Sequence, residues 1–207
     1  MRQIILRVTD SSDDAEMLTF DAVTNREYFK TVSLTEVFKA IKNVVKDRVN
    51  TREKLHLLHP EIIALNKNRV MIKQSERKRI VTYEDKAFHI HFPNSVYIMY
   101  FDEKKISNIE AYTYLAWNEE STQLYAYPFP NMLSGNRVCI GSAPREIQDQ
   151  NYVHALENVI FTRYSHRTVD NIKSFKDTIK YFEYLEKNDF PYELLIDLKK
   201  ELREVMR

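Results

Sequence analysis

The two glycines of this chain, Gly135 and Gly141, lie within four residues of its single cysteine, Cys139. A chain of 207 residues with average composition would hold roughly 14 glycines, so glycine is strongly depleted everywhere else. Three of the six prolines lie in the same stretch, residues 127–144. Glycine is needed where the backbone must adopt a positive φ or approach another backbone closely. These residues are therefore predicted to form a shaped loop that presents the thiol.

Composition predicts a packed protein with balanced charge. Hydrophobic residues make up 43% and charged residues 29%, which favours a folded core over disorder. The formal net charge of +1 predicts no broad attraction to nucleic acid. The basic cluster SERKR, residues 75–79, is interpreted as a solvated turn.

The same counts bear on the compartment. One cysteine excludes an internal disulfide, which fits a reducing environment. The amino-terminal run MRQIILRVTD lacks the apolar core of a signal peptide. No apolar run approaches the roughly 18 residues that a membrane span requires. We therefore expect a soluble cytoplasmic protein.

Periodicity divides the chain into segregated helices and strands. The first 30 residues carry short apolar alternations that predict a strand or hairpin. Residues 33–48 repeat apolar residues at helical spacing behind Ser33 and Glu36, a capping-box pair, which predicts a helix. Over residues 69–127 the period changes to two, and short strands with short turns predict an antiparallel meander.

Three helices are predicted after the cysteine. Apolar residues recur at helical spacing over residues 149–164, 171–188 and 191–207, and Pro191 suits the first turn of the last helix. The order of helix, antiparallel strands, cysteine loop and further helices predicts the α+β class. The last two helices are expected to pack on the sheet, and a partner surface or a homodimer seam is the alternative.

The cysteine loop resembles that of a known enzyme family. Cys139 follows the tripeptide Phe129-Pro130-Asn131 with eight residues from asparagine to cysteine, and it lies in the run GNRVCI. This resembles ubiquitin-conjugating enzymes, in which His-Pro-Asn precedes the catalytic cysteine by the same spacing within a Gly-x-x-[Val/Ile]-Cys-Leu pattern. Phe129 replaces the tripeptide histidine, which is mainly structural in the family, so the departure bears on loop geometry more than on chemistry.

A closer resemblance is to the bacterial branch called prokaryotic ubiquitin-conjugating family D, which includes protein B of the plasmid-borne PRTRC cassettes. Its pattern APF-x-N-V-x-x-x-G-R-V-C-L-G is similar to YPFPNMLSGNRVCIG, and its later Phe and Thr-His pair are similar to FTRYSH, which ends at His166. The resemblance is clear over residues 69–168. It implies a UBC-like conjugating domain over residues 1–168 and a helical extension, residues 169–207, packed on the same domain.

The resemblance implies thioester exchange as the reaction. The Cys139 thiolate would attack the C-terminal thioester of a ubiquitin-like modifier held by a ThiF-like activating enzyme, and an acceptor nucleophile, usually a lysine amine, would then take the modifier. A JAB-type peptidase encoded nearby is a further implied partner, and such cassettes occur on plasmids and in antiviral islands, which suggests antiphage defence. The resemblance gives no reason to expect a cofactor or a metal.

Further residues are candidates for this chemistry. Asn131 is interpreted as an oxyanion donor, worth about 3 kcal/mol, or as an Asx turn that shapes the loop, and both roles can hold together. His166 is interpreted as a base for the acceptor, as a bond behind the cysteine loop, or as a structural histidine. Arg137 and Arg145 either favour the thiolate or are exposed arginines whose effect salt screens.

The glycines and the first helix carry two more hypotheses. Gly135 is predicted to permit a left-handed turn before the thiol, and Gly141 to leave room for the modifier's extended tail. Conjugating enzymes often dock the activating enzyme on their first helix. Lys39, Lys42 and Lys46 are therefore candidates for that contact, with a solvated basic face as the alternative.

Other functions stay open on the residues alone. A non-catalytic binding module would resemble the conjugating-enzyme variants that lost their cysteine, and the retained Cys139 argues against it. A cysteine hydrolase would use Cys139 with His166, but it needs an orienting third group. A zinc site formed by Cys139 with His89 and His91 has only weak support from spacing.

Overall fold

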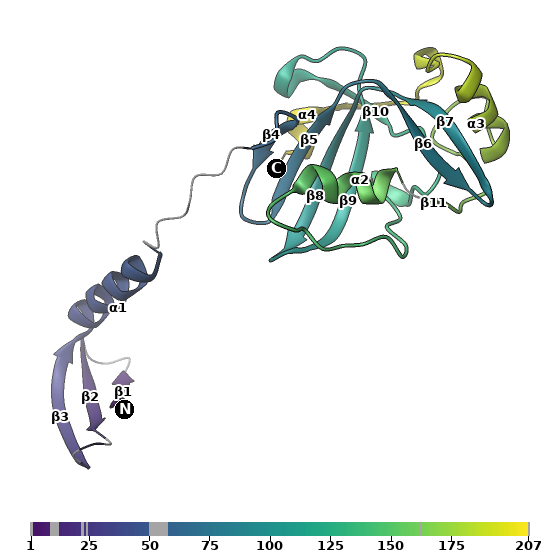
Figure 1. The fold of residues 1–207 in the computed structure, drawn as a ribbon. Helices are drawn as coiled ribbons and strands as arrows, with labels where there is room; N and C mark the ends of the chain where they lie inside the picture. The colour runs from purple at the N-terminus through teal and green to yellow at the C-terminus, as the bar shows by residue number, and fades with distance from the viewer. Residues whose placement is uncertain are drawn as a thin grey trace. The chain divides into compact units, whose positions relative to one another are not determined.

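The computed structural model describes most of the chain (Figure 1). The described residues are 2–8, 13–21, 23, 25–49, 58–161 and 163–206. Contacts group them into two compact units, Met1–Leu57 and Leu58–Arg207. The boundary predicted between residues 168 and 169 lies inside the second unit, which also contains the cysteine.

The first unit is a three-stranded antiparallel sheet followed by a helix. In chain order its elements are β1 (Arg2–Val8), β2 (Asp14–Asp21), β3 (Arg26–Ser33) and α1 (Leu34–Val49). The Ser33 hydroxyl accepts a hydrogen bond from the backbone N–H of Thr35 at 3.2 Å, in the manner of an N-cap. The predicted hairpin therefore gains a third strand, and the helix predicted over residues 33–48 is confirmed.

The second unit is built on a six-stranded antiparallel sheet in the order β12-β10-β9-β8-β5-β4. Its strands are β4 (Ile62–Leu65), β5 (Arg69–Gln74), β8 (Ser95–Asp102), β9 (Lys105–Thr113), β10 (Gln123–Ala126) and β12 (Asp197–Glu201). Val70 of β5 lies opposite Met99 of β8, and both side chains are fully buried. Apolar strand residues thus hold the centre of this sheet in place.

A β-hairpin leaves this sheet between β5 and β8. β6 (Arg77–Tyr83) and β7 (Lys86–Phe92) pair with each other, and the short β11 (Arg163–Tyr164) adds to β6 in parallel. Gln74 pairs with Ser95, so β5 and β8 are neighbours although the hairpin separates them in the chain. The predicted strands are confirmed, but they form two sheets instead of one meander.

The carboxy-terminal part holds fewer helical residues than predicted. Its helices are α2 (Tyr152–Ile160), α3 (Thr178–Lys187), η3 (Tyr192–Leu194) and α4 (Leu202–Val205). The helix predicted over residues 191–207 is wrong, because much of that segment forms β12, which pairs with β10 at one end of the sheet. The backbone hydrogen bonds that β12 makes with β10 outweigh the helical spacing of its apolar residues.

Both faces of the main sheet carry apolar clusters. The larger cluster joins the sheet to the β6–β7 hairpin, α2 and α3, and Figure 1 shows α2 crossing that face. The smaller cluster includes Met71, Val96 and Ile98 of the sheet together with Leu202 of α4. The fold is therefore mixed α+β, with mostly antiparallel strands and few helices. Within the described ranges, no helix has the length and apolar character needed to cross a membrane.

Candidate functional site

The cysteine loop, residues 127–141, begins in a cluster of buried aromatic rings. Phe129 is 1% exposed, and its ring stacks on Phe92 with 4.4 Å between centroids. The rings of Tyr127, Tyr164 and Tyr181 lie 5.2–6.3 Å from that of Phe129. The residue that replaces the tripeptide histidine thus holds the loop entrance by apolar packing.

A tight turn shapes the middle of the loop. The backbone N–H of Leu133 donates to the carbonyl of Arg137 at 2.7 Å, and Gly135 between them has a φ of +72°. The backbone N–H of Val138 donates to the carbonyl of Ile109 at 2.8 Å, which joins the loop to β9. The predicted left-handed turn at Gly135 is confirmed, and the loop forms a short extension of the main sheet.

Cys139 is a free, half-buried thiol between two buried residues, Val138 and Ile140. Its backbone N–H donates to the carbonyl of Asn131 at 2.7 Å. Two residues later, Gly141 has a φ of +55°, and no heavy atom lies within 4 Å of the place where a β-carbon would stand. The backbone beyond the thiol is therefore open on that side.

The side chain of Asn131 faces the segment that follows α2. Its carboxamide oxygen accepts hydrogen bonds from the backbone N–H groups of Ser165 and His166, both at 3.1 Å. Its carboxamide nitrogen donates to the carbonyl of Arg163 at 3.4 Å. Asn131 itself has a φ of +61°, a conformation that asparagine tolerates better than most residues. These contacts make Asn131 a link between the cysteine loop and residues 163–166.

His166 is half-buried, and its peptide is held on both sides. Its N–H donates to Asn131, and its carbonyl accepts from the Thr178 hydroxyl at 2.7 Å. The imidazole forms no hydrogen bond or ion pair with another residue in the part of the chain that the structure describes. Asn131 thus binds the backbone N–H groups of both Cys139 and His166, which brings the three sequence-predicted residues together.

The tyrosines beneath the loop supply packing without charge. The Tyr97 hydroxyl donates to the Tyr127 hydroxyl at 3.1 Å, and burial raises the pKa of Tyr97 to about 12. Burial also raises the pKa of Tyr127 and of Tyr164 well above the ordinary value. These phenols are therefore neutral at physiological pH and are no source of a base for the thiol.

Arg137 and His91, which were considered as neighbours of the thiol, form contacts with other groups. The Arg137 guanidinium donates to the carbonyl of Ser134 at 3.2 Å, so it braces the turn of its own loop. The His91 imidazole nitrogens lie 3.7 Å from carboxylate oxygens of Glu76 and Asp189. No group of three or more His, Cys, Asp or Glu residues suited to a metal occurs among the described residues.

The sequence did not predict which groups bind the Asn131 side chain. The FTRYSH segment was of interest because of the His166 imidazole, whereas the backbone of residues 163–166 makes the contacts to Asn131. Backbone groups leave no mark in side-chain motifs, so no residue pattern predicts these contacts. On α1, the side chains of Lys39 and Lys42 are exposed, and the Lys46 side chain lies outside the described residues.

Comparison with models of protein families shows which family the chain belongs to. The sequence model of prokaryotic E2 family D matches residues 36–198, a stretch that contains Asn131, Cys139 and His166. The chain belongs to prokaryotic E2 family D. E2 proteins are the ubiquitin-conjugating class, so the resemblance seen in the sequence is confirmed at the level of the family. Neither the curated proteins nor the solved structures compared with the chain include a match.

Membership in E2 family D indicates a role in ubiquitin-like conjugation, with a ubiquitin-like modifier and an activating enzyme as partners in general. The matched region of this E2 family D protein begins in α1 and ends in β12, so it includes both sheets of the second unit. The carboxy-terminal strand β12, which takes the place of the predicted helix, therefore starts within the region that the family model matches.

Proposed function

We propose that Cys139 accepts a ubiquitin-like modifier as a thioester from a ThiF-like activating enzyme and passes it to an acceptor nucleophile. The observation that supports this is a free, half-buried thiol on a loop in which Asn131 forms hydrogen bonds both with Cys139 and with residues 165 and 166. Family membership supplies the reaction class. The proposed setting is the cytoplasm, where reducing conditions keep a lone thiol available.

The two steps balance without a cofactor. In the first, the Cys139 thiolate attacks the modifier's C-terminal carbonyl carbon, a new C–S bond forms, and the thiolate of the activating enzyme leaves. In the second, an acceptor amine attacks the same carbon, an amide bond forms, and the electron pair of the C–S bond returns to the Cys139 sulfur. The proton lost by the amine passes to a base or to water.

The neighbouring residues receive different roles in this proposal. Asn131 positions the loop, since both of its carboxamide atoms already bind the backbone of residues 163–166. Its second amide hydrogen is the one available to an oxyanion. The imidazole of His166 has no partner among the described residues, so it is the proposed base for the acceptor proton. Lys39 and Lys42 on α1 are the proposed contact for the activating enzyme.

Incubation with a ThiF-like activating enzyme, ATP and a ubiquitin-like modifier tests the proposal. A transferase gives a covalent adduct that a reductant removes and that Cys139→Ala abolishes. Noncovalent association alone would indicate a binding module, and release of cleaved modifier without an adduct would indicate a cysteine hydrolase. Either of those two results would overturn the proposal.

A further inference from the structure

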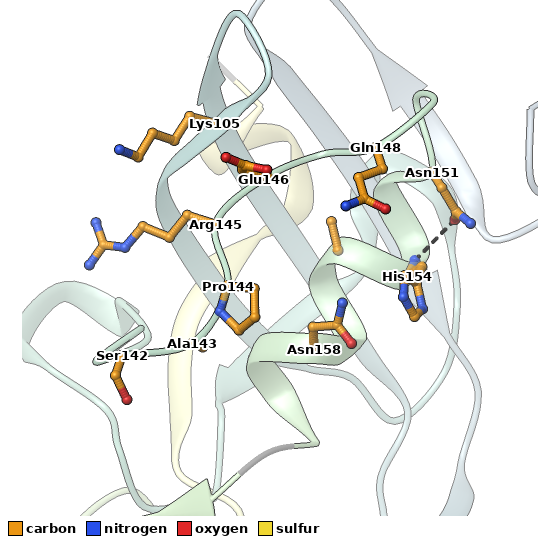
Figure 2. Close-up of a pocket in the computed structure, with 11 residues that line it drawn as sticks. Lys105, Ser142, Ala143, Pro144, Arg145, Glu146, Gln148, Asn151, His154 and Asn158 are labelled. Carbon is orange, nitrogen blue, oxygen red and sulfur yellow. Dashed lines mark hydrogen bonds between the residues drawn. The ribbon is translucent and has the colours of Figure 1, made fainter.

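A pocket of about 530 Å³ begins three residues after Cys139 (Figure 2). One wall is the segment of residues 142–148, and the opposite wall is α2, which contributes His154 and Asn158. The volume falls within the range of roughly 300–1,000 Å³ that is typical of ligand sites. The first lining residue of this segment, Ser142, directly follows Gly141 in the chain.

The walls of this pocket are held by backbone hydrogen bonds. Ile106 N–H donates to the carbonyl of Arg145 at 2.7 Å, and Ile147 N–H donates to the carbonyl of Lys104 at 2.7 Å. The first turn of α2 is capped by the Asn151 side chain, which accepts from the N–H of His154 at 3.2 Å (Figure 2). The hollow is therefore part of the folded structure and already formed without a ligand.

Apart from Asn151, which caps α2, the polar side chains around the pocket have no partner among the described residues. Lys105 and Arg145 extend from the same rim in Figure 2, and neither forms a hydrogen bond or ion pair through its side chain with another described residue. The same holds for the side chains of Gln148, His154 and Asn158. Glu146 is the only carboxylate among the described residues of the lining. The pocket thus offers two unpaired cations, one carboxylate, and amide side chains that both donate and accept hydrogen bonds.

The lining combines apolar surface with amide and charged side chains. Its apolar residues are Ala143, Pro144 and Ala155, and none of the described residues that line it is Phe, Tyr or Trp, the aromatic residues common in small-molecule sites. Small side chains and uncommitted amides suit an extended peptide, whose backbone both donates and accepts hydrogen bonds. The cations on the rim suit a carboxylate on that peptide.

We propose that this pocket binds an acidic side chain of the polypeptide segment that approaches Cys139, with Arg145 and Lys105 as the recognising groups. The inference rests on the proposed function, which brings a peptide to the thiol. Two peptides come there in that function, the tail of the modifier and the acceptor. The chemistry they would share is a carboxylate on an extended chain, within a few residues of the reacting group.

Peptide binding tests the pocket without any thioester. The full chain is titrated with acetyl-Ala-Glu-Ala-Gly-Gly amide and with its Gln counterpart, followed by amide NMR shifts. An exposed ion pair predicts about threefold to fivefold tighter binding of the Glu peptide, with the difference shrinking as salt is added. Arg145→Glu should remove this preference. Lys200→Glu makes the same change of charge on the exposed face of β12 and should retain it. Equal affinities of the two peptides for the wild-type chain would overturn the proposal.

Thioester chemistry then identifies the source of the carboxylate. The same two peptides are offered as mercaptoethanesulfonate thioesters, and separately as lysine-containing acceptors for the loaded chain. Faster loading by the Glu thioester assigns the pocket to the modifier's tail, and faster discharge to the Glu acceptor assigns it to the acceptor. No difference in either reaction would contradict the proposal. A complete absence of thioester would instead contradict the proposed function, and the binding titration would still decide the pocket.

Discussion

Asn131 makes hydrogen bonds with Cys139 and with residues 163–166. Its carbonyl binds the N–H of Cys139, and its carboxamide binds three backbone groups of residues 163–166. At the residue scale, the two roles predicted for this asparagine, loop ordering and oxyanion donation, thus have different support. Loop ordering rests on hydrogen bonds that are present, and oxyanion donation rests on one remaining amide hydrogen.

Asn131→Gly isolates the side-chain hydrogen bonds, because glycine adopts the φ of +61° without strain. We expect the free energy of unfolding to fall by about 0.5–1.5 kcal/mol, since three backbone groups of exposed or half-buried residues lose their hydrogen-bond partner. Asn131→Ala should cost about 1 kcal/mol more, because alanine is strained at positive φ. Urea unfolding of the three proteins measures both differences. A glycine variant as stable as the wild type would show that the link has no structural role.

Gly141 allows backbone strain and steric blocking to be separated. Its φ of +55° is strained for valine but tolerated by asparagine, and neither β-carbon would meet another atom. Gly141→Val is therefore expected to lose about 1–2 kcal/mol of stability, while Gly141→Asn stays near the wild type. Both should slow thioester loading if the modifier's tail crosses this glycine. Normal loading of Gly141→Asn, measured by reductant-sensitive adduct, would exclude that path.

At the scale of elements, local sequence patterns predicted an element correctly where its apolar residues recur at the spacing of the structure that it forms. The spacing of apolar residues predicted α1 and the strands from β5 to β10. The same spacing misled over residues 191–201, where Leu198 fits a helical face and yet belongs to β12, whereas Leu202 begins the short helix α4. Pairing with β10 is a contact between residues far apart in the chain, which no local period reports.

Leu202 tests whether the carboxy-terminal strand and turn are part of the core. It is 2% exposed and packs in the smaller cluster with Met71 and Val96. Leu202→Ala should lower the free energy of unfolding by about 2–5 kcal/mol through the cavity it leaves. Val205→Ala, at a half-buried position of the same turn, is the matched control and should cost less. Equal and small losses for both would mean that this segment is not packed on the sheet.

At the scale of the whole molecule, aromatic packing joins the core to the candidate site. Rings from β7, the cysteine loop, β11 and α3 meet around Phe129. The motif that carries the family resemblance was visible in the sequence, and so were its cysteine and asparagine. The rings that support it come from four separate elements, so their convergence required the fold.

The buried tyrosines predict alkaline unfolding. The pKa of Tyr97 rises from 10.0 to about 12 on folding because burial disfavours the charged phenolate. The unfolded chain therefore loses this proton first, and stability that is fully present below pH 10 is lost as the pH rises toward 12. Urea midpoints between pH 8 and about 11 should fall, and Tyr97→Phe should make the decline shallower. A midpoint independent of pH in this range would contradict the burial of these phenols.

The central claim is that the Cys139 sulfur itself carries the modifier. The most direct measurement is the intact mass of the charged chain, compared between the wild type and Cys139→Ser after incubation with the activating enzyme, ATP and the modifier. The account predicts a single adduct that a reductant removes from the wild type, and an ester adduct on the serine variant that survives the reductant. An adduct that persists in Cys139→Ala, or a wild-type chain that stays unmodified while the activating enzyme is charged, would contradict it.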